Sequence, residues 1–438
     1  MRILCTSDIH LGRIPHLPAL PGEPLSHRTA WDFVRAAALE HRPDLLVLAG
    51  DVIDSDNQFL ETWGPLRDGV LELLRAGISV AAVAGNHDSE VFPELHRVLQ
   101  AEAGFPAGAA FHLLGLAPGI GRRSPAWTYE KVRLAGEELW LAGWSFPERT
   151  FYGNALDSFI PAPDSTPVLG LLHGELDVPG SHHGPLRRAD LAAAPVAQWV
   201  LGHIHLPTGA EGGKHFYCGS PFPLRSNERG AHGCWMLDYA GGRFGAPALV
   251  PCPVRVEALE VPLAEGAATE TGVGSAILTG IQGRLREIQR DNPGLRTLYL
   301  KVRLGGRCRP DAALAVIEPG LQDLPAFDGV AVKLLDRVEV ACTAPIPLET
   351  WAARQGAPGR IARMVLSLQV GAADAEALRL IEAIRQEERD SRLLKTYLAV
   401  PDPLRDPETG GEAWARAQLL RSCWRILDEI WAMEAVNG

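Results

Sequence analysis

The sequence predicts an α/β catalytic region followed by a small α+β region and a helical C-terminal region. Two observations predict this order. Short apolar runs bounded by turn residues recur through the first 205 residues, and the composition then shifts twice further along. A chain of 438 residues also exceeds the usual single domain, so two or three units with ample cores are expected. We place the boundaries at residues 1–254, 255–345 and 346–438.

Five apolar runs rich in Val, Leu and Ala predict buried strands. They are Arg2–Thr6, Leu45–Ala49, Val80–Ala84, Val168–Leu172 and Gln198–Leu201. A polar motif directly follows each run. Because open α/β sheets place their ligands beyond the carboxyl ends of the strands, we expect these motifs to converge along one edge.

The five motifs offer oxygen and imidazole ligands and no thiolate. They are Asp8-Ile9-His10, Gly50-Asp51, Gly85-Asn86-His87-Asp88, His173-Gly174 and Gly202-His203-Ile204-His205. Such donors suit manganese, iron or zinc better than calcium. The set is large enough for two divalent ions, which in such sites lie about 3.5–4 Å apart and activate water against phosphate esters. Asp51 is the candidate bridge because its motif has no second ligand.

The order and spacing of these motifs resemble the calcineurin-like metallophosphoesterases, which form an αββα sandwich. The resemblance implies that Asp8, His10 and His205 hold one metal, while Asn86, His173 and His203 hold the other, with Asp51 between them. It also implies that His87 contacts the scissile phosphate and assists the leaving group, with Asp88 as its orienting carboxylate. Any one of these motifs predicts a simple turn as well as it predicts a functional site. All five in this order predict a site.

A closer resemblance, to SbcD-type DNA repair nucleases, rests on three segments. They are Met1–Gly12, Tyr217–Leu224 and Pro251–Val256. It covers roughly residues 1–255 and is weak beyond about 345. It implies a DNA exonuclease and endonuclease with two divalent metals. We favour Mn²⁺, with Fe²⁺, Zn²⁺ or Mg²⁺ as alternatives. It further implies an SbcC-like coiled-coil ATPase partner that binds the C-terminal helical region, and a homodimer is a further option.

One position departs from the archaeal and eukaryotic relatives. Three residues after Asp51 they carry a histidine tied to exonuclease action, and here Asp54 stands there, as in many bacterial SbcD-type sequences. We expect Asp54 to orient a ligand or a water; the alternative is that it replaces that histidine in placing the DNA end. The pair His182-His183, followed by Arg187-Arg188, is either a contact to the phosphate backbone or a solvated loop.

Net charge is the main objection to a DNA substrate. Residues 1–254 contain 19 Lys and Arg against 27 Asp and Glu, a balance of −8, which is the wrong sign for a polyanion. Arg13, Arg28, Arg122-Arg123 and Arg187-Arg188 are candidates for a local basic stripe. The acidic balance favours the alternative of a phosphodiesterase or phosphatase for small molecules. A non-catalytic scaffold is a third hypothesis, against which the intact ligand set speaks.

The remaining residues carry no chemistry-bearing motif. A Gly/Ala/Thr-rich stretch, a helix over Ile281–Arg290 and strands over Thr297–Leu304 and Val330–Val340 predict the α+β region. The resemblance makes it a DNA-capping domain; the alternative is a structural brace. Helices are expected over 374–398 and 412–435. The last places an apolar stripe on one face, and the stripe predicts either packing within its own domain or docking of a partner helix. Its members are Trp414, Ala417, Leu420, Trp424, Leu427 and Trp431.

The composition also predicts a compartment. We expect a soluble, cytoplasmic protein without a signal segment, because the first catalytic strand begins at Arg2 and no apolar run is long enough to span a bilayer. Seven scattered cysteines without a closely spaced pair indicate reduced thiols.

Overall fold

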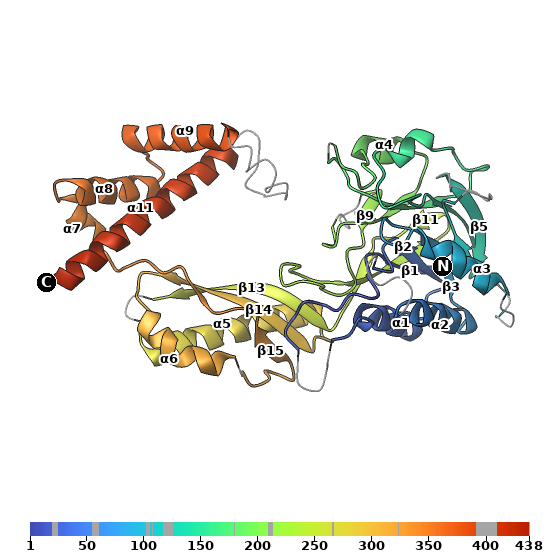
Figure 1. Ribbon diagram of the computed structural model, residues 1–438, viewed down its shortest axis with the longest axis horizontal. Coiled ribbons are helices and arrows are strands. Elements are labelled where there is room, and N and C mark those ends of the chain that lie inside the picture. The colour runs from blue at the N-terminus through green and yellow to red at the C-terminus, as the bar shows by residue number, and fades with distance from the viewer. Residues whose placement is uncertain are drawn as a thin grey trace. The chain divides into compact units, whose positions relative to one another are not determined.

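The structure is a computed structural model of residues 1–438 (Figure 1). It describes all of the chain except residues 20–24, 55–60, 102–105, 107, 117–125, 179, 209–212, 265–266, 323, 391–409 and 438. The chain divides into two compact units. Unit 1 comprises residues 1–258, 284–301 and 324–335, and unit 2 comprises 259–283, 302–323 and 336–438.

Unit 1 contains a seven-stranded sheet with the order β11-β10-β1-β2-β3-β4, in which β12 also pairs with β10. Its strands are β1 (Arg2–Thr6), β2 (Leu45–Ala49), β3 (Ser79–Val83), β4 (Phe111–Leu113), β10 (Gly233–Ala240), β11 (Arg243–Phe244) and β12 (Ala248–Pro251). Strands β1 to β4 are parallel. Strand β3 ends one residue earlier than predicted, because the Ala84 amide donates to Ser145 Oγ and leaves the ladder.

A second, five-stranded sheet has the order β5-β6-β7-β8-β9. Its strands are β5 (Thr128–Leu134), β6 (Glu137–Gly143), β7 (Val168–His173), β8 (Gln198–Gly202) and β9 (His215–Tyr217). Strands β6 to β9 are parallel. The predicted strands Val168–Leu172 and Gln198–Leu201 each extend one residue further, so His173 and Gly202 pair within the ladder.

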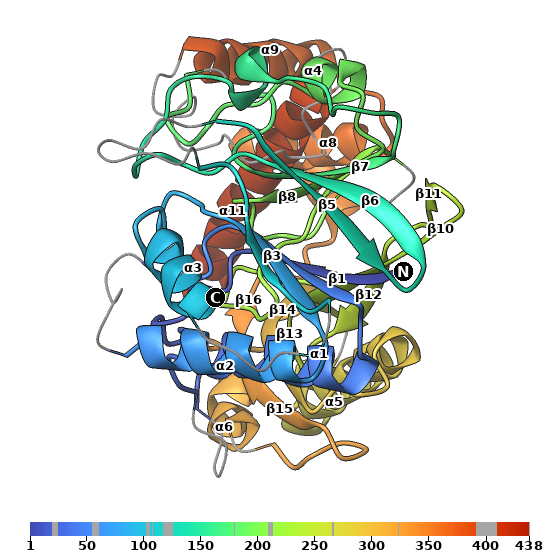
Figure 2. The ribbon, with the colours of Figure 1, turned by 90° about the vertical axis from the view of Figure 1, so that its right-hand side faces the viewer.

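The two sheets pack face to face, with helices on their outer faces (Figure 2). The alternation of side chains along each strand explains the layers. In β1, Ile3 and Cys5 enter the core between the sheets, while Leu4 faces the helices. Helices α1 (Thr29–His41), α2 (Trp63–Arg75) and α3 (Val91–Ala101) cover the first sheet, and α4 (Arg188–Ala193) covers the second. The predicted αββα sandwich is therefore confirmed.

The middle of the chain forms a four-stranded sheet with two helices. Strand β14 (Thr297–Gly306) lies between β13 (Val254–Leu263) and β15 (Ala331–Leu334), and its end pairs with β16 (Glu339–Val340). Helix α5 (Glu270–Asp291) begins eleven residues before the predicted helix, and α6 is Asp311–Leu321. The predicted strand Val330–Val340 is two short strands, because residues 335–338 bend between them.

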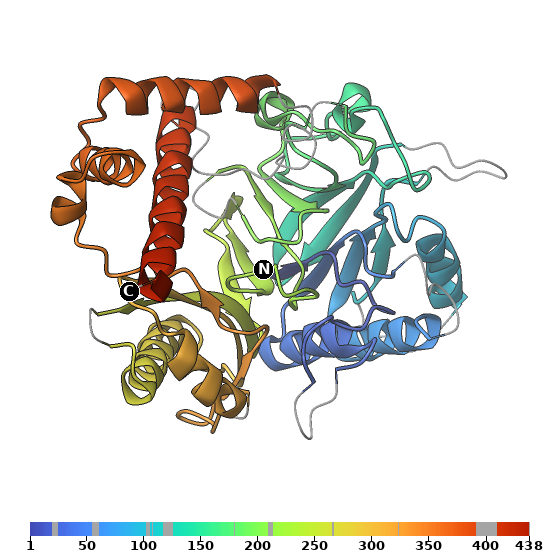
Figure 3. The same cartoon turned by 60° about the vertical axis from the view of Figure 1, so that its left-hand side comes forward.

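The C-terminal residues are helical, as predicted. The described helices are α7 (Leu348–Ala352), α8 (Ala357–Gln369), α9 (Ala375–Asp390) and α11 (Gly410–Asn437). Residues 391–398 of the predicted helix 374–398 lie outside the described residues. In Figure 3 α11 is the long red helix beside α9.

The buried face of α11 differs from the predicted stripe. Its buried residues are Ala415, Leu419, Cys423 and Leu427, at intervals of four, so the buried face is rotated from the one expected. Only Leu427 of the predicted stripe is fully buried, while Trp424 and Trp431 lie at the border of the core.

The three-domain division at residues 254 and 345 stays a prediction. Within the described residues, no helix is long and apolar enough to cross a membrane. All seven cysteines are free thiols.

Candidate metal centre

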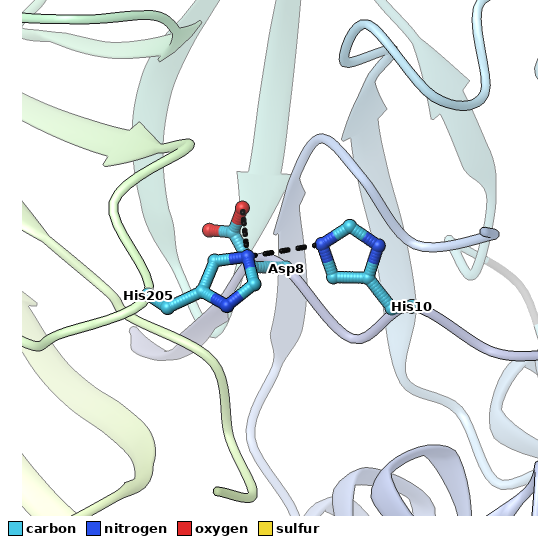
Figure 4. A group of neighbouring side chains, drawn as sticks. All are labelled: Asp8, His10 and His205. Carbon is cyan, nitrogen blue, oxygen red and sulfur yellow. Dashed lines mark hydrogen bonds and ion pairs between the residues drawn. The ribbon is translucent and has the colours of Figure 1, made fainter. Parts of the chain in front are cut away.

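The first and last motifs meet at the carboxyl ends of β1 and β8. Asp8, His10 and His205 each present one ligand atom within 4.8 Å of the others. His205 Nε2 lies 3.1 Å from His10 Nε2 and 4.0 Å from Asp8 Oδ1 (Figure 4). Two imidazole nitrogens and a carboxylate thus face a common point, and they come from segments almost 200 residues apart.

A second group forms between the ends of β2, β3, β7 and β8. Asp51, His173 and His203 present ligand atoms within 4.8 Å of one another. His173 Nε2 lies 3.3 Å from Asp51 Oδ2 and 3.2 Å from Asn86 Oδ1. The amide oxygen of Asn86 therefore joins this group. All seven predicted ligands are brought together.

Asp51 lies between the two groups. Its carboxylate is 4.0 Å from His10 Nε2 on one side and 3.3 Å from His173 Nε2 on the other. Burial acts to raise the pKa of the Asp51 carboxyl, but His173, His10 and His87 outweigh it and hold that pKa far below its usual value. The carboxylate is therefore ionised at neutral pH and faces both groups, as a bridging ligand must.

The second nitrogen of each of three histidines has a partner that fixes which nitrogen faces the centre. His173 Nδ1 donates to the Ala49 carbonyl at 3.0 Å, so its Nε2 is left as the ligand atom. His205 Nδ1 lies 2.8 Å from Glu228 Oε1, and His203 Nε2 lies 3.3 Å from Glu175 Oε1. His205 therefore presents Nε2 and His203 presents Nδ1. Such outer carboxylates orient metal-binding histidines and raise their basicity.

Sequence reasoning missed Glu175 and Glu228. Glu175 could have been found from its place two residues after His173, at the end of the same strand. The His203 imidazole lowers the pKa of Glu175 to about 2. Glu228 lies within a loop, and its oxygens also accept from the Leu224 amide and Ser220 Oγ, so no local signal marked it.

Asp54 lies beside His10. Its Oδ2 is 3.4 Å from His10 Nδ1 and 2.6 Å from Arg13 Nη2, and the carboxylate is buried. Position 54, predicted to orient a ligand or a water, thus holds a carboxylate that lies beside a proposed ligand and pairs with an arginine. Arg13, expected in a basic stripe, is engaged here.

Asp88 holds two motif loops together. Its Oδ1 accepts from the Gly85 amide at 2.7 Å, and its Oδ2 accepts from the Val52 amide at 2.6 Å and the Ile53 amide at 3.3 Å. Burial and the charge of Asp51 raise the pKa of the Asp88 carboxyl to about 7. These contacts join the loops after β2 and β3. That Asp88 orients the His87 ring stays a prediction.

His87 lies at the edge of the centre. Its ring packs edge-on against His10 at 4.9 Å between centroids, and its backbone amide donates to Asp51 Oδ1. Burial is the main cause that lowers the pKa of His87. Its ring nitrogen also falls within 4.8 Å of ligand atoms of His10 and Asp51, so geometry alone does not separate a ligand from a residue that contacts substrate.

The backbone of the motif loops is unusual. Asp8, His10, Asp51 and His203 have φ values of 50°, 48°, 50° and 97°, in the left-handed region that non-glycine residues rarely adopt. Gly85 has no room for a side chain, because a Cβ there would lie 2.2 Å from Asp51 Oδ1. Strained backbone of this kind persists where the surrounding structure imposes it, and it clusters at functional sites.

The other predicted basic groups are engaged or outside the described residues. Arg28 pairs with Asp32, Arg187 with Asp190 and Asp157, and Arg188 with Asp177. Arg122 and Arg123 lie outside the described residues. Each described arginine of the predicted stripe is therefore paired with a carboxylate, and the stripe itself stays a prediction.

The donor set fits two divalent metal ions. Four imidazole nitrogens, two carboxylates and one amide oxygen face two neighbouring points. No thiolate takes part among the described residues. The mutual approach of His10 Nε2 and His205 Nε2 to 3.1 Å also suits two lone pairs directed at one cation.

The chain is similar to several known proteins. Residues 1–207 match the family model of the calcineurin-like phosphoesterases. The SbcD component of the nuclease SbcCD from Rhodobacter capsulatus is 28% identical over 74% of this chain and 85% of its own length, and that of Escherichia coli K12 is 24% identical over 67% and 76%. A dimetal phosphatase from Danio rerio is 12% identical, with a TM-score of 0.34, over 55% of this chain and 93% of its own.

Proposed function

From the premise that residues 1–207 form a calcineurin-like phosphoesterase domain, we propose that this protein is a two-metal DNA nuclease that acts in DNA repair or processing. The observation that carries the hydrolytic part is the position of Asp51 between two groups of ligands. The similarity to the SbcD component of the nuclease SbcCD over 74% of the chain supports DNA as the substrate.

In this proposal Asp8, His10 and His205 would hold one metal ion, Asn86, His173 and His203 would hold the other, and Asp51 would be a ligand of both. We favour manganese. When bound, such a pair of ions would polarise the phosphoryl oxygens and lower the pKa of a water molecule.

The chain's own residues provide the remaining chemistry. Glu175 and Glu228 fix the nitrogens that His203 and His205 present, and Asp54 lies 3.4 Å from Nδ1 of His10. His87 stands outside the two ligand sets, where its imidazole binds the scissile phosphate and donates a proton to the departing sugar oxygen. Asp88 keeps His87 in place by joining the loops that follow β2 and β3.

The C-terminal helices are the proposed binding region for an SbcC-like coiled-coil ATPase. The two relatives are each one subunit of the nuclease SbcCD, which supports a second component here. Two exposed apolar side chains on α11 favour a docking surface in this region. Ile426 is 40% exposed and Met433 is 58% exposed, and their spacing of seven residues places them on one face of the helix. Two turns of helix thus offer apolar groups outside the buried face. A homodimer is a further option.

One assay separates the nuclease from its alternative. Purified protein with manganese is given linear duplex DNA, single-stranded DNA and a chromogenic phosphodiester. We expect both DNA substrates to be cleaved, with chelation of the metal stopping the reaction. Cleavage of the small diester with no cleavage of either DNA would reject the nuclease and favour the small-molecule phosphodiesterase or phosphatase.

The alternative has an observation in its favour. Residues 1–254 carry a balance of −8, and Arg13, Arg187 and Arg188 are each paired with a carboxylate. A polyanion must therefore find its contacts elsewhere on the surface of unit 1.

A further inference from the structure

A series of rings leads from the candidate metal centre to the surface of unit 1. The His183 ring lies 5.0 Å from the ring of the ligand His203, measured between centroids. His182 lies 4.1 Å from His183, and Tyr152 lies 6.1 Å from His182. All three are tilted ring pairs, with angles between ring planes of 31°, 43° and 39° in order outward from His203. Rings from two separate loops therefore form one row.

The side chains of the row become more exposed with distance from His203. His183 is half-buried, His182 is exposed, and 74% of Tyr152 is exposed. A tyrosine of this exposure leaves most of its ring accessible to another molecule. Burial thus decreases steadily with distance from His203.

Backbone hydrogen bonds fix the row in place. The Phe151 amide donates to the His182 carbonyl, and the Gly184 amide donates to the Phe151 carbonyl, both at 2.9 Å. The Phe151 ring packs against Trp144 at 4.7 Å between centroids. The loops that carry Tyr152 and His182 are therefore paired and anchored to the core of the second sheet, which limits the entropy lost when a ligand binds.

We propose that Tyr152, His182 and His183 form a stacking platform for an unpaired nucleobase of DNA beside the scissile phosphodiester. The proposal rests on the nuclease function proposed above, and it names how that site holds its substrate. Every nucleobase has a flat π-face, so stacking binds single strands with little sequence preference. It also requires no positive charge, which matters in a domain where Arg13, Arg187 and Arg188 are paired with carboxylates.

The platform explains how an acidic domain could hold a polyanion. Phosphate contacts give an affinity that falls steeply with salt, whereas stacking on an uncharged ring does not depend on salt in this way. The gain in affinity that the bases provide over a strand without bases should therefore not depend on salt, although the total affinity does.

Binding measured without turnover tests the platform directly. The full-length protein is kept in chelator, and a labelled oligothymidylate is compared with an oligonucleotide of equal length that lacks bases. We expect the wild type to bind the strand with bases about tenfold or more tightly. This ratio should hold between about 50 and 200 mM salt, although both affinities fall.

Substitutions locate the effect. Tyr152→Ala should abolish most of the preference for bases, His182→Ala should reduce it, and Tyr152→Phe, which keeps the ring, should change it by less than about twofold. Ile160→Ala, at another exposed apolar residue of unit 1, is the matched control. Melting temperature and bound metal should be unchanged in every variant.

The outcomes separate this inference from the nuclease function. Equal binding of the two strands by the wild type, or a full preference in Tyr152→Ala, overturns the platform even if the enzyme cleaves DNA. A base preference that disappears in Tyr152→Ala supports the platform. Failure of the wild type to cleave any DNA with manganese would then overturn the nuclease alone.

Discussion

The motif loops of unit 1 and the C-terminal helices of unit 2 contrast in what they bury. The loops bury Asp8, His10, Asp51 and His173; the first three have left-handed backbone, and His173 pairs with a carboxylate. The helices bury Leu427 and other apolar residues. The motif loops thus bury groups arranged for chemistry at the expense of stability, and the buried face of the helices contributes stability. Substitutions should separate the two regions by what they change.

His87→Ala tests the chemical side and should have the largest effect. Loss of an acid that acts on the leaving group lowers the cleavage rate by about 10²–10⁴-fold. Both metals should remain, because His87 is outside the proposed ligand sets. Elemental analysis beside the nuclease rate checks this, with His112→Ala on β4 as the control. Loss of metal in parallel with activity would make His87 a ligand, which its distance from His10 and Asp51 permits.

Leu427→Ala tests the stabilising side. Removing a fully buried leucine costs about 2–5 kcal/mol of the free energy of unfolding. Chemical denaturation should show this loss, while the rate on short DNA should be unchanged. Ile426→Ala removes an exposed side chain from the adjacent position and should cost far less. If Leu427→Ala instead slowed the cleavage of short DNA in the folded protein, the contrast between the two regions would fail.

Asp54→Asn addresses the position that departs from other relatives. Because Asp54 lies 3.4 Å from His10 Nδ1, we expect exonuclease and endonuclease rates to fall by a similar factor of about 10–100. Linear duplex and circular single-stranded DNA measure the two activities, and the surface variant Asp32→Asn is the control. A selective loss of exonuclease activity would show that Asp54 places the DNA end.

The mildest perturbation, a change of pH without any substitution, should alter the affinity for metal. Burial disfavours the charged His173, but the Asp51 carboxylate outweighs burial and raises the pKa of His173 to about 9. Since the ligand must be neutral, a proton competes with the metal below this pKa, and affinity should rise about tenfold per pH unit toward it. Titration calorimetry with manganese between pH 6 and 8 measures this slope. Activity should also fall as the pH decreases, and excess manganese should shift this fall to lower pH. If the fall stays at the same pH over a wide range of manganese concentrations, loss of metal is not its cause.

The sequence predicted best what depends on local pattern. Strands Arg2–Thr6 and Leu45–Ala49 have the predicted bounds, and the seven predicted ligands lie together. They follow strands of two sheets, however, and not of one sheet as predicted. The stripe on α11 packs within its own domain, as one of the two predictions had it, but its centre was placed wrongly. Bulky tryptophans were given the centre, whereas they lie at the border of the core and the smaller Ala415 and Cys423 are buried. Glu228 was missed because tertiary contacts alone bring a loop carboxylate to His205.

The site also joins the two sheets to each other. The His203 amide donates to the Asp8 carboxylate, and His173 Nδ1 donates to the carbonyl of Ala49, so loops of the second sheet are bonded to those of the first. Separation of the sheets at this edge would break these bonds and expose the same carboxylate that the metals require. Exchange of these amide hydrogens with solvent and release of the metal ions should therefore proceed through the same opening, at rates set by one local unfolding equilibrium.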